Sequence, residues 1–155
     1  MRGGAKITTV QIYNAKQDKI VTVEKIEKSE ADWKKLLTEE QYEITAKKGT
    51  ESPGTCTFNN VHEPGIFQCV RCGTDLFRSS TKFESGTGWP SYYEPISLLN
   101  LVEQPDMSLG RVRTEVLCAR CDSHLGHVFD DGPPPTGKRY CMNGLALKFV
   151  PENQL

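Results

Sequence analysis

The sequence has no long apolar segment and no excess of charge of either sign. Lysine and arginine total 19 against 20 for aspartate and glutamate, a net charge of -1, whereas nucleic-acid-binding domains usually have a basic excess. Apolar runs are short, since Leu98 and Leu99 are soon followed by Asn100 and Glu103, and none approaches a membrane span. Residues 1–6 have no apolar region behind them and are not typical of a signal peptide. We therefore expect a monomeric cytoplasmic protein that binds neither nucleic acid nor membrane.

Cysteine is present six times, but there is no export signal of the kind that would favour three disulfides. Four of the cysteines form two C-x-x-C pairs, Cys69 with Cys72 and Cys118 with Cys121. Each such turn places two sulfurs close enough to share an ion, and two turns complete a tetrahedral set, for which zinc fits best. We expect one structural Zn²⁺ per chain. The alternatives are two redox-active C-x-x-C motifs or two local disulfides.

The N-terminal third alternates between strand and helix signals. Residues 7–13 and 19–26 are rich in Ile, Val and Thr and flank a polar turn, which predicts a β-hairpin. Residues 29–32 form a capping box of the S-x-x-D type, and residues 38–41 form a second of the T-x-x-Q type. These patterns predict two short helices, the second ending near Lys48.

Beyond Gly49 the chain is interrupted repeatedly by Gly and Pro, with short β-prone runs between them. This pattern predicts a mainly β protein of antiparallel sheets with short N-terminal helices, stapled by zinc. The expected strands are residues 66–70, 96–102, 111–117 and 139–150, with shorter pieces around Phe77 and Val128.

Cys141 lies outside both cysteine pairs and is a candidate nucleophile. On a strand it would share a face with Arg139 and Asn143. A neighbouring guanidinium favours the thiolate by lowering the thiol pKa, which is about 8.5 when unperturbed. The strand would continue to Val150 on alternating faces unless Gly144 introduces a bulge. Alternatively, Cys141 is a small buried hydrophobic residue, as most free cysteines are.

Two further segments hold candidate site residues. His124 and His127 follow the second cysteine pair, and an imidazole held by a neighbouring carboxylate can transfer protons near neutral pH. They could instead bind zinc, although four cysteines already satisfy that ion. Trp89 follows Gly86 and Gly88 and could form an aromatic wall for a methyl or thioether group. The alternative is a core tryptophan at a turn.

Taken together, these segments resemble methionine sulfoxide reductase B. The matching stretches lie within residues 29–150 in the family's order and comprise Trp33–Tyr42, Cys69–Gly73, Gly88–Ser91, Cys118–Cys121, His124–Phe129 and Arg139–Asn143. The resemblance implies a fold of two antiparallel sheets and reduction of the R epimer of methionine sulfoxide, free or in oxidised proteins. Residues 1–28 lie outside it and are expected to form an added hairpin, with residues 29–155 as the catalytic domain.

The resemblance also implies roles for the residues that do the chemistry. Cys141 would attack the sulfoxide sulfur as a thiolate. His127, with His124 nearby, would help to protonate the sulfoxide oxygen, while Asp131 and Arg139 would tune these groups. Release of methionine would leave Cys141 as a sulfenic acid, which condenses readily with a second thiol.

For the substrate and the second thiol, the resemblance implies that Asn143 orients the sulfoxide and Trp89 packs on its methyl group. Many family members have the resolving cysteine at the position of Thr87, and a threonine cannot form a disulfide. Some members use a cysteine in the N-terminal region, which points to Cys56 here. A Cys56–Cys141 disulfide would be reduced by thioredoxin or another dithiol. If Cys56 is too distant, a small thiol would reduce the sulfenic acid directly.

Two other functions are compatible with parts of the pattern. A non-catalytic zinc-stabilised module of the same fold could bind a peptide, a small ligand or RNA, because a fold does not fix a function. Such a module would not need Cys141 together with both histidines and Arg139. The second possibility is a thiol oxidoreductase in which the C-x-x-C pairs themselves cycle.

Overall fold

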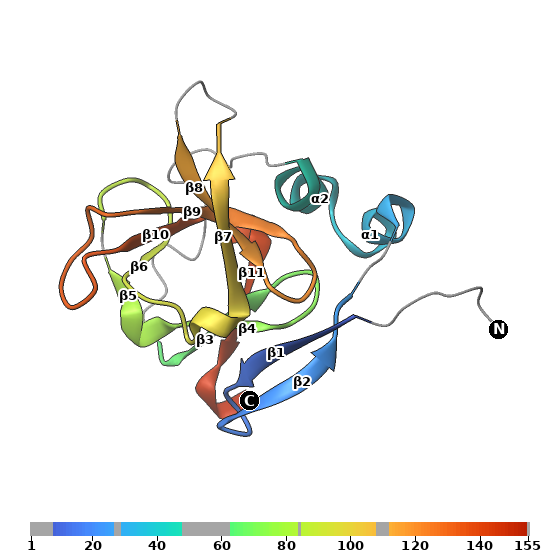
Figure 1. Cartoon of the computed structure of the whole chain (residues 1–155), viewed down its shortest axis with the longest axis horizontal. Coiled ribbons are helices and arrows are strands. Elements are labelled where there is room, and N and C mark those ends of the chain that lie inside the picture. The colour runs from blue at the N-terminus through green and yellow to red at the C-terminus, as the bar shows by residue number, and fades with distance from the viewer. Residues whose placement is uncertain (1–7, 27–28, 48–62, 84, 108–111, 155) are drawn as a thin grey trace.

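The structure is a computed structural model that describes residues 8–26, 29–47, 63–83, 85–107 and 112–154 (Figure 1). The prediction that Cys56 is the resolving thiol therefore lies outside the described residues.

The largest element is a six-stranded sheet in which every neighbouring pair of strands is antiparallel. At one edge of this sheet, β7 and β8 form an antiparallel pair that extends away from the other strands (Figure 1). The strands in spatial order are β5 (Lys82–Phe83), β6 (Ser91–Tyr92), β10 (Arg139–Met142), β9 (His124–Phe129), β8 (Arg113–Cys118) and β7 (Leu101–Asp106).

A second antiparallel sheet consists of β11 (Leu147–Pro151), β3 (Gly65–Cys69) and β4 (Asp75–Arg78). Aromatic rings from both sheets form the core. Phe77 of β4 stacks on Tyr92 of β6 with ring centroids 4.3 Å apart. The prediction of a mainly β protein with two antiparallel sheets is confirmed for this part of the chain.

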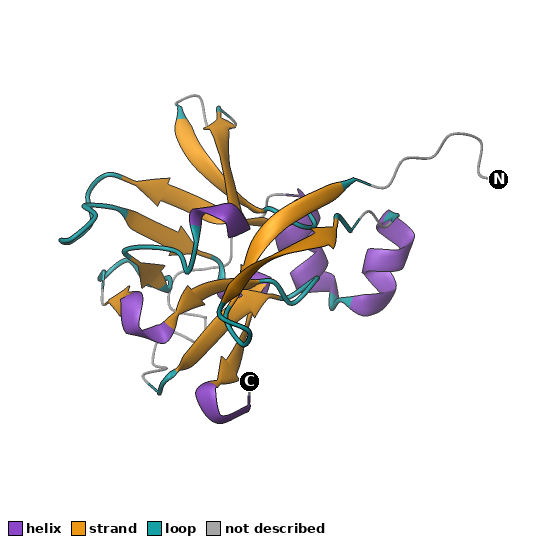
Figure 2. Cartoon of the chain, turned by 60° about the horizontal axis from the view of Figure 1, so that its bottom comes forward, coloured by secondary structure: helices purple, strands orange, loops and turns teal. Residues whose placement is uncertain are grey.

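The predicted N-terminal hairpin is present as a separate two-stranded sheet of β1 (Thr9–Asn14) and β2 (Lys19–Glu24) (Figure 2). It is hydrogen-bonded to the rest of the molecule. The side chain of the buried Asn100 accepts from Tyr13 N at 2.8 Å and donates to Tyr13 O at 3.0 Å. Asp75 accepts a third bond, from Ala15 N at 2.9 Å.

Both predicted helices are present, α1 (Glu30–Leu36) and α2 (Glu39–Lys47). The capping box before α2 is complete, because Thr38 N donates to Gln41 Oε1 at 2.9 Å and Gln41 N donates to Thr38 Oγ1 at 3.1 Å. The second helix packs against β9 and the segment Gly144–Ala146. Among the described residues, no helix has the length and apolar character needed to cross a membrane.

Four short 3₁₀ helices are present among the described residues, and two of them correct predicted strands. They comprise Ser79–Thr81, Leu98–Asn100, Gly144–Ala146 and Glu152–Gln154. The expected strand over residues 139–150 is broken by Gly144–Ala146, where Ala146 N donates to Asn143 O, so its halves join different sheets. The prediction of a strand over residues 96–102 was also wrong. Ser97 caps a 3₁₀ helix by accepting a hydrogen bond from Leu99 N, and the strand β7 begins only at Leu101.

Candidate active site and metal site

A cavity of about 290 Å³ lies where β9 and β10 run side by side in the six-stranded sheet. It contains five of the residues that the sequence predicted for the site, so the structure brings them together, although their roles remain predictions. The lining residues are Thr87, Trp89, Arg113, Gly126, His127, Phe129, Arg139, Cys141, Met142 and Asn143.

Strand pairing fixes the position of Cys141. It lies directly opposite His127 of β9 on one side and Ser91 of β6 on the other. Cys141 and Arg139 are both half-buried and line the cavity, whereas Tyr140 between them is buried. The predicted sharing of one strand face by Cys141 and Arg139 is therefore seen in β10.

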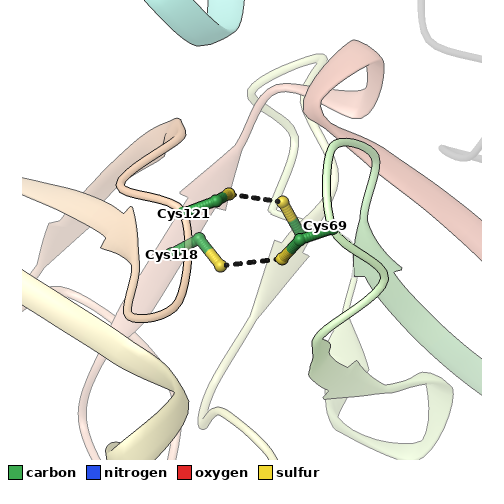
Figure 3. A group of neighbouring side chains, drawn as sticks. Cys69, Cys118 and Cys121 are labelled. Atoms are coloured by element: carbon green, nitrogen blue, oxygen red, sulfur yellow. Dashed lines mark hydrogen bonds between the residues drawn. The ribbon is translucent and has the colours of Figure 1, made fainter. Parts of the chain in front are cut away.

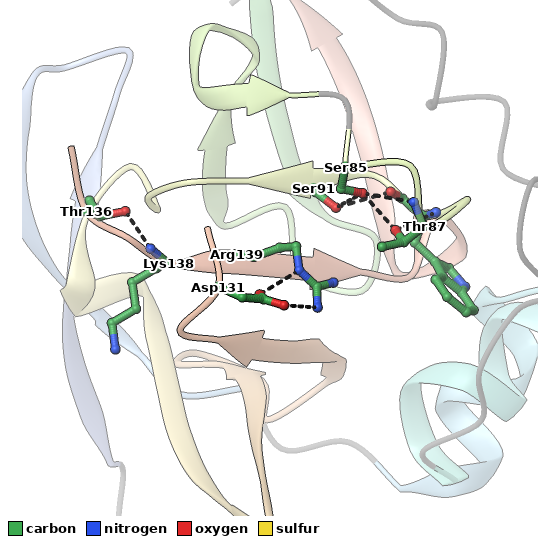
Figure 4. A network of polar contacts seen from close by, with 8 residues as sticks. Ser85, Thr87, Ser91, Asp131, Thr136, Lys138 and Arg139 are labelled. Carbon is green, nitrogen blue, oxygen red and sulfur yellow. Dashed lines mark hydrogen bonds and ion pairs between the residues drawn. The ribbon is translucent and has the colours of Figure 1, made fainter. Parts of the chain in front are cut away.

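The positively charged guanidinium of Arg139 lies beside Cys141 in the cavity wall. This group forms two hydrogen bonds to Asp131, from Nε to Oδ1 at 2.9 Å and from Nη2 to Oδ2 at 3.2 Å (Figure 4). These bonds hold the pKa of Asp131 below its ordinary value. The same bonds raise the pKa of Arg139, and a hydrogen bond with Cys141 raises it further. Asp131 is exposed and does not line the cavity, and its contact with the cavity wall is through Arg139.

His127 is held by a carboxylate that the sequence analysis missed. Its Nε2 lies 2.7 Å from Oδ2 of Asp106, which is buried at the end of β7. Arg113 lies opposite Asp106 on β8 and approaches the same oxygen at 3.5 Å. Asp106 precedes His127 by 21 residues, so no local motif signals the pair.

His124 is not part of the cavity wall. Its Nδ1 lies 2.7 Å from Oε2 of the fully buried Glu115, whose other oxygen accepts from Gln104 Nε2 at 3.0 Å. Its ring lies edge-on to that of His127 with centroids 5.5 Å apart. The structure thus places His127 at the cavity and His124 behind it, and Glu115 is a second partner that sequence reasoning missed.

The loop that presents Trp89 is fixed by hydroxyl groups (Figure 4). Ser85 Oγ lies 2.8 Å from Thr87 Oγ1 and accepts from Ser91 Oγ at 2.9 Å. Gly86, with φ 76°, adopts a left-handed conformation that favours glycine. The result is a half-buried Trp89 at the cavity, which Thr87 of the same loop also lines.

The two C-x-x-C turns meet at the end of the core and point their sulfurs at one another (Figure 3). Cys69 Sγ lies 3.6 Å from Cys121 Sγ, Cys72 Sγ lies 3.5 Å from Cys118 Sγ, and all four lie within 4.8 Å. Zinc–sulfur bonds of about 2.3 Å at tetrahedral angles require sulfurs about 3.8 Å apart. The four cysteines therefore fit a tetrahedral metal ion, and they are not paired as disulfides.

The two turns have the same backbone geometry although their sequences differ. Gly73 N donates to Cys69 O and Asp122 N donates to Cys118 O, each at 2.9 Å. Both donors are left-handed, Gly73 with φ 76° and the non-glycine Asp122 with φ 61°. Without a cation, hydrogen bonding with Cys118 and burial raise the pKa of Cys69 well above its ordinary value. A bound cation would offset the cost of holding four thiolates together.

Comparison with known proteins agrees with this geometry. The SelR domain family model matches residues 37–151. A protein of Pseudomonas fluorescens is 52% identical over 129 residues, which cover 83% of this chain and 99% of that protein. A protein of Methanosarcina mazei is 55% identical over 128 residues, covering 83% of this chain and 91% of that protein. Both are named peptide methionine sulfoxide reductase MsrB.

Proposed function

Because this chain belongs to the methionine sulfoxide reductase B family, we propose that it reduces the R epimer of methionine sulfoxide to methionine at the expense of a thiol. The observation that supports this most directly is the cavity in which Cys141 lies opposite His127 and beside Arg139. Transfer of oxygen from a sulfoxide to a thiol needs a nucleophilic thiolate and a proton donor, and Cys141 and His127 can supply these, with Arg139 favouring the thiolate.

In the proposed reaction the thiolate of Cys141 attacks the sulfoxide sulfur. The bond that forms between Cys141 Sγ and the substrate sulfur then breaks together with the sulfur–oxygen bond, as the oxygen moves to Sγ and leaves methionine and a sulfenic acid on Cys141. Substrate sulfur gains two electrons and Cys141 loses two. The reaction consumes one proton when it begins from the thiolate, and His127 delivers that proton to the oxygen.

Arg139 favours the reactive form of Cys141. Its positive charge stabilises a neighbouring thiolate, and the two hydrogen bonds that the guanidinium donates to Asp131 hold it in place. The part proposed for Asp131 in the reaction is indirect. Asp131 orients Arg139 and does not meet the substrate.

The substrate side chain would lie between Trp89 and Asn143. The indole offers an apolar wall for the methyl group, with a modest sulfur–aromatic contribution. Asn143 is buried at the cavity, and its Nδ2 donates to Leu125 O at 3.4 Å, which fixes the amide that would orient the sulfoxide. Protein-bound methionine sulfoxide is the proposed substrate class, as in the names of the relatives.

For regeneration we propose a Cys56–Cys141 disulfide that thioredoxin or a similar dithiol reduces. Thr87 lines the cavity but cannot be the resolving residue, because a threonine cannot form a disulfide. Peptide mapping after a single turnover without reductant should show the disulfide. Normal turnover of Cys56→Ser with thioredoxin, together with no such peptide, would reject the assignment in favour of direct reduction by a small thiol. Thioredoxin as reductant, a monomeric state and a cytoplasmic location remain predictions of the sequence.

The four clustered cysteines are proposed to hold one structural Zn²⁺. Their sulfurs face a common centre in two turns of matched geometry, which favours a shared ion over two cycling dithiols. The ion would tie β3 to β8 and would take no part in the reaction. Metal analysis should give one zinc per chain, with those thiols unreactive until it is removed.

The test of the proposed activity is turnover of each epimer of a methionine sulfoxide peptide with dithiothreitol. We expect the R epimer to be reduced and the S epimer to be left. Cys141→Ser should abolish turnover while retaining zinc. Activity that survives in Cys141→Ser, or a preference for the S epimer, would contradict the proposal.

A further inference from the structure

We infer that Asp106 and Arg113 are positioning residues that act through His127 and together set the pH range in which its imidazole donates a proton. This inference rests on the proposed reductase function and adds two residues to it. Their geometry at the end of the β7–β8 hairpin is the basis for the assignment.

Asp106 and Arg113 form the last pair of that hairpin and meet His127 at a single oxygen atom. Oδ2 of Asp106 is 2.7 Å from Nε2 of His127 and 3.5 Å from Nη2 of Arg113. Asp106 is 4% exposed and does not line the cavity, whereas Arg113 and His127 both do. The carboxylate therefore lies outside the cavity and contacts two residues of its wall, His127 and Arg113.

The charges have opposite effects on the imidazole. A buried carboxylate costs free energy unless a cation pairs with it, so Asp106 favours the protonated form of His127. If His127 were the sole partner of Asp106, donation of the proton by His127 would leave the buried carboxylate of Asp106 beside a neutral imidazole. Arg113 supplies a permanent positive charge at the same oxygen, which reduces that cost and lets the proton leave.

Other charged groups near His127 are committed elsewhere. Glu115, opposite His127 on β8, is bound to His124 and Gln104. On β10, Arg139 is bound to Asp131, and Cys141 is the nucleophile itself.

Among the described residues, Asp106 is the carboxylate that the hydrogen bonds assign to His127. The contact with Arg113 is long at 3.5 Å, and Asp106 is the carboxylate with which Arg113 forms an ion pair in the described part of the chain.

The experiment is the pH profile of kcat/KM for an R-sulfoxide peptide with dithiothreitol. Donation requires a protonated imidazole, so its titration produces the alkaline limb. Asp106→Asn should move this limb to lower pH by about one unit and reduce kcat/KM at neutral pH about 10-fold. Arg113→Met should move it to higher pH, and Arg113→Lys, which keeps the charge, should leave it near the wild-type position.

Controls separate this inference from a structural role and from the proposed function. Asp130→Asn alters an exposed aspartate paired with Lys138 and should leave the profile unchanged. A purely structural role would lower the whole profile in both variants without moving the limb, and that result would overturn the inference. If Asp106→Asn fails to fold, the contrast between Arg113→Met and Arg113→Lys decides alone. Absence of turnover in the wild-type protein would instead reject the proposed function.

Discussion

At the residue scale, the two histidines of β9 are bound to carboxylates through different ring nitrogens. Asp106 meets Nε2 of His127, whereas Glu115 meets Nδ1 of His124. A carboxylate can only accept, so the bonded nitrogen carries the hydrogen in each neutral ring. We therefore expect His127 in the Nε2–H form and His124 in the Nδ1–H form.

Nitrogen-15 NMR of Cys141→Ser protein at alkaline pH would measure both tautomers. The chain has three histidines, so single His→Gln variants suffice to assign the signals. The same tautomer in His124 and His127 would contradict the hydrogen-bond geometry. Asp106→Asn should alter the signals of His127 more than those of His124, which serves as the internal control.

The residues predicted from sequence differ in kind from those that were missed. Cys141, His127 and Arg139 lie in short local motifs that a chain reading can recognise. Asp106 and Glu115 lie on β7 and β8, and the pairing of β8 with β9 includes a register shift between Val116 and Leu117. Sequence spacing does not reveal that shift, so the partners of the histidines required the structure.

At the element scale, the helices were predictable and the last strand was not. Capping boxes are local signals, and they fixed the starts of α1 and α2. Residues 139–150 alternate without an evident stop, because β10 and β11 both bury side chains in the core between the sheets. The 3₁₀ helix Gly144–Ala146 carries the chain from one sheet to the other, and nothing in the apolar pattern distinguishes this from one long strand.

The close pairing of β9 and β10 makes Gly126 a sensitive position. A Cβ added there would lie 2.2 Å from Cys141 O and 2.9 Å from Met142 Cα, so the strand bearing the nucleophile would have to move. We expect Gly126→Ala to lower the free energy of unfolding by about 3 kcal/mol and to reduce kcat strongly.

Urea denaturation and steady-state kinetics would measure both effects of Gly126→Ala. Gly137→Ala is the matched control, because no atom lies within 4 Å of a Cβ there and only its φ of 73° is unfavourable. That control should cost about 1 kcal/mol and leave kcat intact. Equal effects of the two substitutions would show that the contact with Cys141 is unimportant.

At the scale of the whole molecule, the chain before the first C-x-x-C pair contacts both C-x-x-C turns, and residues 24–26 contact the second. Arg120 of the second turn donates to Glu24 O at 3.0 Å, and its own carbonyl accepts from Ile26 N at 2.9 Å. Lys25 pairs with Asp122 of the same turn at 2.7 Å. The hairpin and the residues after it thus support the end of the core that contains the four cysteines.

The first C-x-x-C turn is braced by the helices in an equivalent way. Arg71 occupies the position that Arg120 has in the other turn. Its guanidinium lies over the ring of Trp33 at 4.7 Å, and its Nε donates to Thr45 Oγ1 at 2.9 Å. The chain before the first cysteine therefore contacts both halves of the site at matching positions.

The division into a hairpin and a catalytic domain can be tested by removing residues 1–28. The hairpin precedes the family match of residues 37–151 and does not line the cavity, so kcat should be unchanged. Asn100 would lose both bonds to Tyr13, and we expect a Tm lower by about 2 to 8 °C. Calorimetry and kinetics on the truncated chain would measure this, and loss of turnover in a folded product would contradict residues 29–155 as the catalytic unit.

Removal of the metal should affect the whole molecule and not the active site alone. The four cysteines join β3 and β8, which belong to different sheets, so an ion held by them links the two halves of the core. Chelation should lower Tm by about 10 to 20 °C, because structural zinc contributes directly to folding. Scanning calorimetry with metal analysis and thiol titration would follow the change. Cys141→Ser is the control, since it removes a thiol outside the cluster and should retain both zinc and Tm. An unchanged Tm in protein shown to be metal-free would mean that hydrogen bonds in the two turns suffice to hold the sheets together.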